Sequence, residues 1–153
     1  MKIRSITSFY DPRAHSARAD LLELAAFSER LKLRISQDLM PVQSSRLATI
    51  PFPLYLDTHL PGQTLQTVLD MEKTALELGW QYLSLGPALP DQPASTALIP
   101  QLLAAAPSVF FSAVMADNKC LYPAAIRGNA ELIQQVSRLT PDGFTNLRFA
   151  ALA

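Results

Sequence analysis

The chain has 153 residues, of which 49% are hydrophobic and 17% are charged. This length suits one domain with a core of its own, and the composition excludes a disordered chain. The 13 basic side chains are balanced by 13 acidic ones, so the chain lacks the net positive charge that proteins use to bind nucleic acid non-specifically. We therefore expect no nucleic-acid partner.

The few cysteines, histidines and glycines exclude several classes of site. One Cys and two His cannot form an internal disulfide or a Cys-rich zinc site, which fits a chain of the reducing cytoplasm. The closest glycines, Gly79 and Gly86, are seven positions apart, whereas phosphate loops and the nucleophile elbow need two glycines within about five positions. No apolar run reaches the roughly 20 residues of a membrane span, so we expect no membrane contact.

The first part of the chain predicts a strand, a helix and a second strand. Residues 2–9 are rich in β-branched and aromatic side chains, and the Asp11-Pro12 pair that follows favours a helix start. Residues 16–39 predict an amphipathic helix, because apolar side chains recur at steps of three and four. These side chains are Leu24, Phe27, Leu31, Ile35 and Leu39. Residues 42–49 predict the second strand.

The middle of the chain predicts a connector, two helices and a short strand. Three prolines between residues 50 and 62 remove backbone donors, which argues against a central strand there and favours an ordered connector. Residues 64–78 predict a helix that ends at Gly79, and residues 80–85 predict the third strand. Ser95 is placed to cap the next helix. The predicted inward stripe of that helix is Leu98, Ile99, Leu102, Leu103 and Ala106.

The last part of the chain predicts two strands and a helix between them. Residues 108–115 (SVFFSAVM) are the most apolar segment, which predicts a central strand covered on both faces. Pro123 is placed to begin the last helix. The side chains predicted to face inward from it are Ile126, Ala130, Ile133 and Val136. Residues 144–152 predict the fifth strand.

Five predicted strands thus alternate with four predicted helices, which is the pattern of right-handed βαβ units in a parallel α/β sheet. No repeat or flexible linker divides the sequence, so residues 1–153 are expected to be one unit. The last strand has no helix after it, which leaves apolar surface and an unpaired sheet edge. We therefore expect a homo-oligomer formed through the open edge.

Four segments resemble one protein family. They are residues 2–7 (KIRSIT), 42–53 (VQSSRLAT and IPFP), 77–88 (ELGWQYLSLGPA) and 143–153 (GFTNLRFAALA). They are similar to domain of unknown function family 711, an uncharacterised UPF-type family. The resemblance implies a pyruvate formate-lyase-like barrel, which is a ten-stranded α/β barrel built from two five-stranded parallel halves. It also implies that this chain is the N-terminal half of a longer domain.

The resemblance does not supply a reaction, because a shared fold does not imply a shared function. Radical enzymes with that barrel need a glycine in a C-terminal motif and a cysteine on a central finger loop, and this sequence shows neither. Cys120 lies in a loop-like stretch before a helix, where a helix N-terminus would favour its thiolate. The alternative is a thiol that serves only for packing.

The candidate ligand-binding residues are Asp11, Arg46, Asn146 and Arg148. Ligands of open parallel sheets gather at the carboxyl ends of the strands, and a cation within a strand needs an anion, a carbonyl or water. The two arginines therefore favour a small anionic ligand, and an internal ion pair with a nearby aspartate is the alternative.

The two histidines give no firm site. Asp57 and His59 share a turn and could act as an orienter and a base, but no nucleophile lies near them in sequence, so a surface pair is the alternative. A metal site would need His15, Asp57 and His59 from separate loops, and we expect none.

The sequence is compatible with three functions. The first is a half-barrel that contributes fold and part of a small-molecule site. The second is an enzyme whose anionic-substrate site is completed by another half, and the third is a self-contained flavodoxin-like binding module. The sequence indicates no substrate, cofactor or reaction type.

Overall fold

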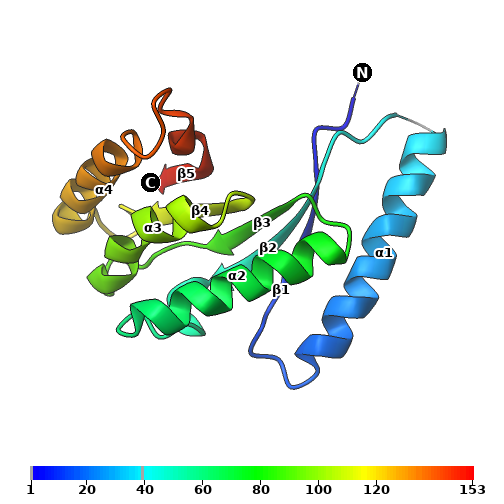
Figure 1. Ribbon diagram of the computed structural model, residues 1–153, viewed down its shortest axis with the longest axis horizontal. Helices are drawn as coiled ribbons and strands as arrows, with labels where there is room; N and C mark the ends of the chain where they lie inside the picture. The colour runs from blue at the N-terminus through cyan, green and yellow to red at the C-terminus, as the bar shows by residue number, and fades with distance from the viewer. Residues whose placement is uncertain (1, 39) are drawn as a thin grey trace.

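The described residues form one five-stranded parallel sheet with the strand order β1-β2-β3-β4-β5 (Figure 1). The structure is a computed structural model that describes residues 2–38 and 40–153, so Leu39 of the predicted helical stripe lies outside the described residues. The elements in chain order are β1 (Ile6–Tyr10), α1 (Ala17–Asp38), β2 (Ser45–Pro51), η1 (Phe52–Leu54), α2 (Pro61–Glu77), β3 (Tyr82–Gly86), α3 (Pro93–Ala105), β4 (Val109–Val114), α4 (Pro123–Val136), η2 (Phe144–Arg148) and β5 (Phe149–Leu152).

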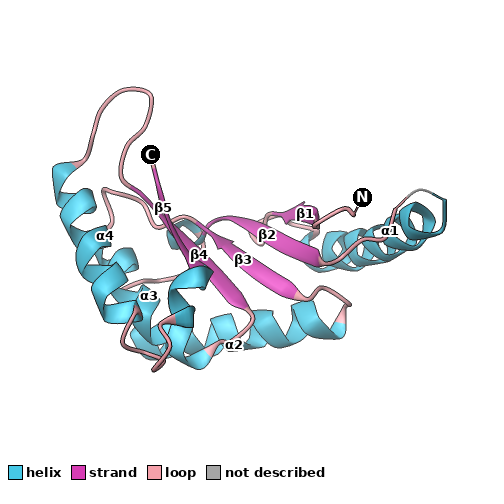
Figure 2. Cartoon of the chain, turned by 90° about the horizontal axis from the view of Figure 1, so that it is seen from above, coloured by secondary structure: helices cyan, strands magenta, loops and turns pink. Residues whose placement is uncertain are grey.

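The sequential strand order puts the helices on one face of the sheet. Each strand lies directly beside the next strand of the chain, and βαβ connections are right-handed, so every crossover helix falls on the same side. Figure 2 shows α2, α3 and α4 along the outside of a curved sheet whose other face is open. The flavodoxin-like alternative is therefore wrong, because that fold has the strand order 2-1-3-4-5.

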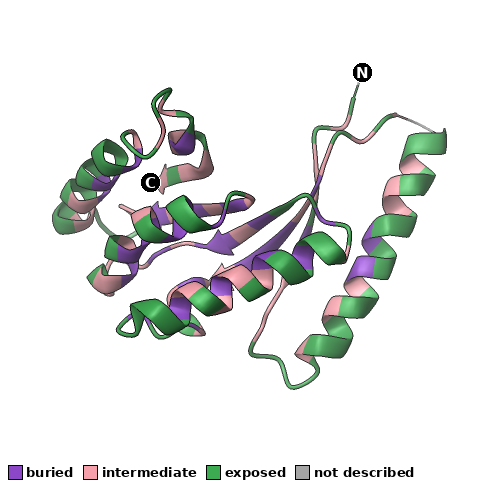
Figure 3. Ribbon diagram, viewed as in Figure 1, coloured by how far each residue is buried: buried purple, intermediate pink, exposed green. Residues whose placement is uncertain are grey.

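The core lies between the sheet and the helices. Alternate strand residues that face the helices are buried, among them Leu83, Leu85, Val109 and Phe111 (Figure 3). Phe111 packs edge to face against Phe52 with their ring centroids 5.7 Å apart. The alternate residues of β4 are only half-buried, so the prediction that this strand is covered on both faces is wrong.

The open face displays large side chains. Phe9 on β1 is 79% exposed, and Tyr82 on β3 and Leu152 on β5 are more than a third exposed. Phe110 and Val114 on β4 are half-buried on the same face. A sheet face of this kind loses the burial free energy of each wet apolar side chain, about 1.5–3 kcal/mol for full burial.

The inward face of α4 differs from the predicted one. Val136 is buried as predicted, but Ile126 and Ile133 are about two-fifths exposed and Ala130 is exposed, whereas Asn129 and Leu132 are buried. The apolar spacing was misleading because a polar residue takes one of the inward positions. Neither amide atom of Asn129 has a hydrogen-bond partner among the described residues. On α1, Phe27 is likewise exposed rather than inward.

The fifth strand is shorter than predicted. Gly143 adopts a left-handed backbone conformation with φ of 69°, and the chain then makes the 3-10 helix η2 before β5 begins at Phe149. Arg148 therefore ends a helix and is not part of a strand. Ser95 also differs from its predicted capping role, since its hydroxyl lies inside α3 and donates to the carbonyl of Gln92 at 2.6 Å.

The second strand begins and ends later in the chain than predicted, and it ends in a bulge. β2 continues to Pro51, which pairs with Gly86 after a shift of register between Ala48 and Pro51. Pro51 is tolerated because it closes the strand at this irregularity. The amide of Gly86 donates to the hydroxyl of Thr49 at 3.1 Å, and so a side chain fills the place of a ladder bond.

We predict that Gly86→Ala destabilises the fold. A Cβ at this position would overlap the carbonyl group of Ile50 and the nitrogen of Pro51, both of which are backbone atoms that cannot rotate away. Urea denaturation should show a loss of about 1–3 kcal/mol, the usual cost of overpacking. Gly62→Ala is the matched control, because outside its own helix turn no described atom lies within 4 Å of a Cβ placed there. Equal unfolding midpoints for the two variants would contradict this account.

We also predict that the chain associates through the open face. Sedimentation velocity over a range of micromolar concentrations should show a species larger than the monomer, because association removes Phe9 and its neighbours from water. Phe9→Glu should shift the distribution toward monomer. Phe27→Glu, at an exposed site on α1, should not. A wild-type monomer that does not depend on concentration would refute the prediction.

Candidate functional site

Arg46 lies in the middle of an aromatic cluster on the open face. The strand register places it between Thr7 of β1 and Tyr82 of β3. Its guanidinium carbon lies 5.2 Å from the centroid of the Phe110 ring, a cation–π distance, and Phe110 packs edge to face against Tyr82 at 5.3 Å. Two neighbouring rings and one cation therefore share one patch of the sheet.

The guanidinium of Arg46 has an unused hydrogen-bond donor. Its Nε is buried and has no hydrogen-bond partner among the described residues. Ser84, which pairs with Ala48 and Phe110, is half-buried on the same face of the sheet. The patch thus holds an arginine donor and a nearby hydroxyl, which together suit an oxyanion.

Arg148 has its hydrogen bonds supplied by the chain itself. It lies at the amino end of β5, where its Nη1 donates to the carbonyls of Ala106 at 2.6 Å and Val109 at 3.4 Å, and its Nη2 donates to Leu103 at 2.6 Å. Burial lowers the pKa of the Arg148 guanidinium, and the carboxylate of Glu72 acts in the opposite direction. Arg148 therefore satisfies the last carbonyls of α3.

The structure does not bring the four predicted ligand residues together. Asp11 follows β1 and Arg148 precedes β5, and these strands are the opposite edges of the sheet. Asp11 forms an exposed ion pair with Arg13 at 3.0 Å, and this hydrogen-bonded contact lowers the pKa of the Asp11 carboxyl. Asn146 lies on η2, close in sequence to Arg148, and its Oδ1 is buried with no partner among the described residues.

A second polar group occupies the loop after β4. Asp117 Oδ1 accepts hydrogen bonds from the amides of Lys119 at 2.8 Å and Cys120 at 3.0 Å, and its Oδ2 accepts one from the Tyr122 hydroxyl at 2.8 Å. These bonds lower the pKa of Asp117, the amide of Lys119 most of all. The Asp117 carboxylate and then the Cys120 thiol raise the pKa of Tyr122.

This loop borders a cavity at the carboxyl end of the sheet. The cavity has a volume of about 480 Å³ and also contacts Val114 of β4 and Asp91 of the β3–α3 loop. Sequence reasoning missed Tyr122, because nothing near it in the sequence shows that its hydroxyl turns back to Asp117. Cys120 is a free, exposed thiol in this loop, and its reactivity stays a prediction.

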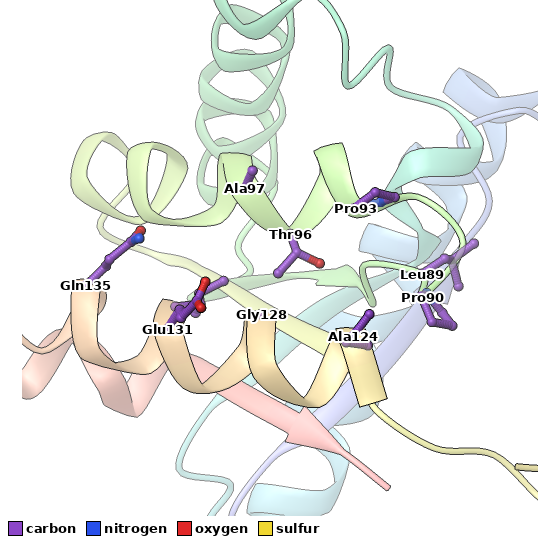
Figure 4. A pocket seen from close by; sticks show the side chains of 11 residues that line it. Leu89, Pro90, Pro93, Thr96, Ala97, Ala124, Gly128, Glu131 and Gln135 are labelled. Carbon is purple, nitrogen blue, oxygen red and sulfur yellow. The ribbon is translucent and has the colours of Figure 1, made fainter. Parts of the chain in front are cut away.

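The remaining candidates are local features. Asp57 Oδ1 accepts from the amide of His59 at 3.0 Å, which makes a turn rather than an acid–base pair. Across residues 2–38 and 40–153, no three His, Cys, Asp or Glu side chains gather as a metal site, and no helix is long and apolar enough to span a bilayer. A cavity of about 410 Å³ between α3 and α4 is lined mainly by small or apolar groups such as Ala97, Ala124 and Gly128 (Figure 4).

The comparisons with known proteins identify the family. Residues 1–153 match the family described as Uncharacterised ACR (DUF711), and the chain belongs to this family. A search of curated proteins finds no match. The family assignment agrees with the resemblance of the strand segments and adds no reaction to it.

We predict that Arg148→Met lowers stability. The substitution leaves carbonyl oxygens at the end of α3 without their donors, and each unmade buried bond costs about 1–3 kcal/mol. The midpoint of urea unfolding should fall, while the matched variant Arg138→Met, at an exposed position, should unfold like the wild type. An unchanged midpoint in Arg148→Met would show that these bonds do not hold the fold.

Proposed function

We propose that this chain supplies half of the wall of a small-molecule chamber, in which Arg46 binds an anionic ligand. The observation that carries the proposal is the uncovered sheet face around Arg46, whose buried Nε has no hydrogen-bond partner in the described chain. A bound carboxylate or phosphate group would accept from this donor and neutralise the cation.

The chamber requires a cover, since the open face carries exposed aromatic and aliphatic side chains. A second five-stranded layer would bury them and complete a barrel of ten strands, as the fold resemblance implies. Another copy of the chain that lies over the open face is the alternative cover. Either cover would lower the dielectric constant around Arg46 and strengthen its attraction for an anion.

The residues around Arg46 favour a small ligand with a flat or apolar body. Phe110 and Tyr82 present ring surface beside the guanidinium, and Ser84 offers a hydroxyl. Of the other predicted ligand residues, Asn146 has an Oδ1 without a partner among the described residues, whereas both Nη atoms of Arg148 already donate to backbone carbonyls. A catalytic role would need groups from the covering layer.

The free thiol of Cys120 supports a location in the reducing cytoplasm.

Thermal unfolding in the presence of phosphate, benzoate and citrate tests this proposal. A saturating anion should raise the unfolding temperature, because ligand at about 100 times its Kd adds about 2.7 kcal/mol of stability. Arg46→Met should abolish the shift, and Arg46→Lys should retain part of it. The control is Arg127→Met, an exposed arginine on α4.

Two outcomes would overturn the anion site. One is a wild-type chain that no anion in the panel stabilises. The other is an anion-dependent rise in unfolding temperature that is the same in Arg46→Met as in the wild type, which would show that the anion binds at a different cation.

A further inference from the structure

A separate cavity lies between α1 and α2, on the helix-covered side of the sheet. It has a volume of about 780 Å³, which falls within the roughly 300–1,000 Å³ of small-molecule pockets. Its floor is made of the buried strand side chains of Leu47 and Leu83, and the buried Ala75 of α2 also lines it. Figure 1 shows that α1 diverges from α2 along its length, and residues of both helices line the cavity.

The walls of this cavity are largely apolar. Leu21 and Leu22 face it from α1, and Met71 and Leu78 face it from α2. Leu22 is 52% exposed, so an apolar side chain that borders the cavity is left in water. The apolar part of a ligand would cover this exposed surface, and removing it from water would favour binding.

The three charged side chains among the described lining residues lie on the two helices that flank the cavity. On α2, Asp70 accepts from the side chain of Gln66 at 3.0 Å, and Glu77 is paired with Lys73 at 3.9 Å. On α1, the guanidinium of Arg18 is exposed at the same cavity and has no ion-pair partner among the described residues. Asp70 and Glu77 keep their negative charges, so Arg18 is the one cation among the described residues that line the cavity, and an anionic group of a ligand would bind on its side.

A neutral donor also lines the cavity. The hydroxyl of Tyr55 is already bonded to Thr49 at 2.8 Å, whereas the hydroxyl of Tyr10 has no partner in the described chain. Burial, together with the nearby carboxylates of Asp20 and Asp11, raises the pKa of Tyr10, so this phenol keeps its proton at neutral pH. Of these carboxylates, Asp11 is paired with the cation Arg13 at 3.0 Å, whereas Asp20 keeps its charge and accepts from the neutral hydroxyl of Ser16 at 2.7 Å.

We propose that this cavity binds a carboxylic acid with an apolar tail, of the medium-chain fatty acid class. The tail lies over the floor of Leu47 and Leu83, and the carboxylate accepts from Arg18 and from the Tyr10 hydroxyl. The site is on the opposite face of the sheet from Arg46. It is therefore independent of the anion site proposed above, and either site can fail without the other.

Calorimetric titration of the whole chain with decanoate, below its micelle concentration, tests the proposal. Decanoate should bind at one saturable site, and Arg18→Glu should weaken it at least tenfold. Arg30→Glu, the same charge change at an exposed position of α1 outside the cavity, should have no effect. Decanol, which has the tail without the charge, should bind the wild type and Arg18→Glu equally.

A second pair of variants tests the location of the tail. Thr74→Trp places an indole at the cavity and should block both ligands, whereas Leu76→Trp, on the same helix but outside the cavity, should block neither. Arg46→Met should leave decanoate binding unchanged. No saturable binding of decanoate to the wild type, or equal loss in Arg18→Glu and Arg30→Glu, would overturn the proposal.

Discussion

The handedness of the βαβ connection is the constraint on which the rest of this structure depends. When each strand pairs with the next one along the chain, right-handed crossovers put every helix on one side of the sheet. One face then gains a core of leucine, valine and phenylalanine, and the other keeps the alternate residues of the same strands without a layer over them. Both proposed sites follow from this asymmetry, the anion site on the uncovered face and the cavity between two diverging helices on the covered one.

The element order was predictable from sequence because it depends on local patterns. Proline and glycine positions marked the ends of elements, and the apolar run from Val109 to Val114 marked the central strand. The side of the sheet that each residue faces was harder to predict, since it depends on which strands are neighbours. A doubly wound order would have covered both faces of this strand, and only the sequential order leaves Phe110 half-buried on an open one.

The candidate site was predictable to a similar degree. Arg46 and Arg148 look alike in the sequence, because each is a single cation within or beside an apolar strand. Successive side chains of a strand point to opposite faces of the sheet. Leu47 is buried against the helices, so Arg46, which precedes it, points to the other face, and this alternation can be recognised in the sequence. The hydrogen bonds of Arg148 join it to carbonyls that are 39 to 45 positions away in the chain, and no local pattern contains them.

The contrast between these two arginines also bears on which of them can serve a ligand. A guanidinium has five N–H donors and cannot lose its charge in a protein, so its remaining freedom depends on the acceptors already around it. The carbonyls of Leu103, Ala106 and Val109 accept from the two Nη atoms of Arg148, and moving the side chain to a ligand would leave these carbonyls without that donor. Arg46 rests on a ring that attracts its charge but accepts no conventional hydrogen bond from its Nε. The ring thus holds the cation in place and leaves its donor for an incoming anion.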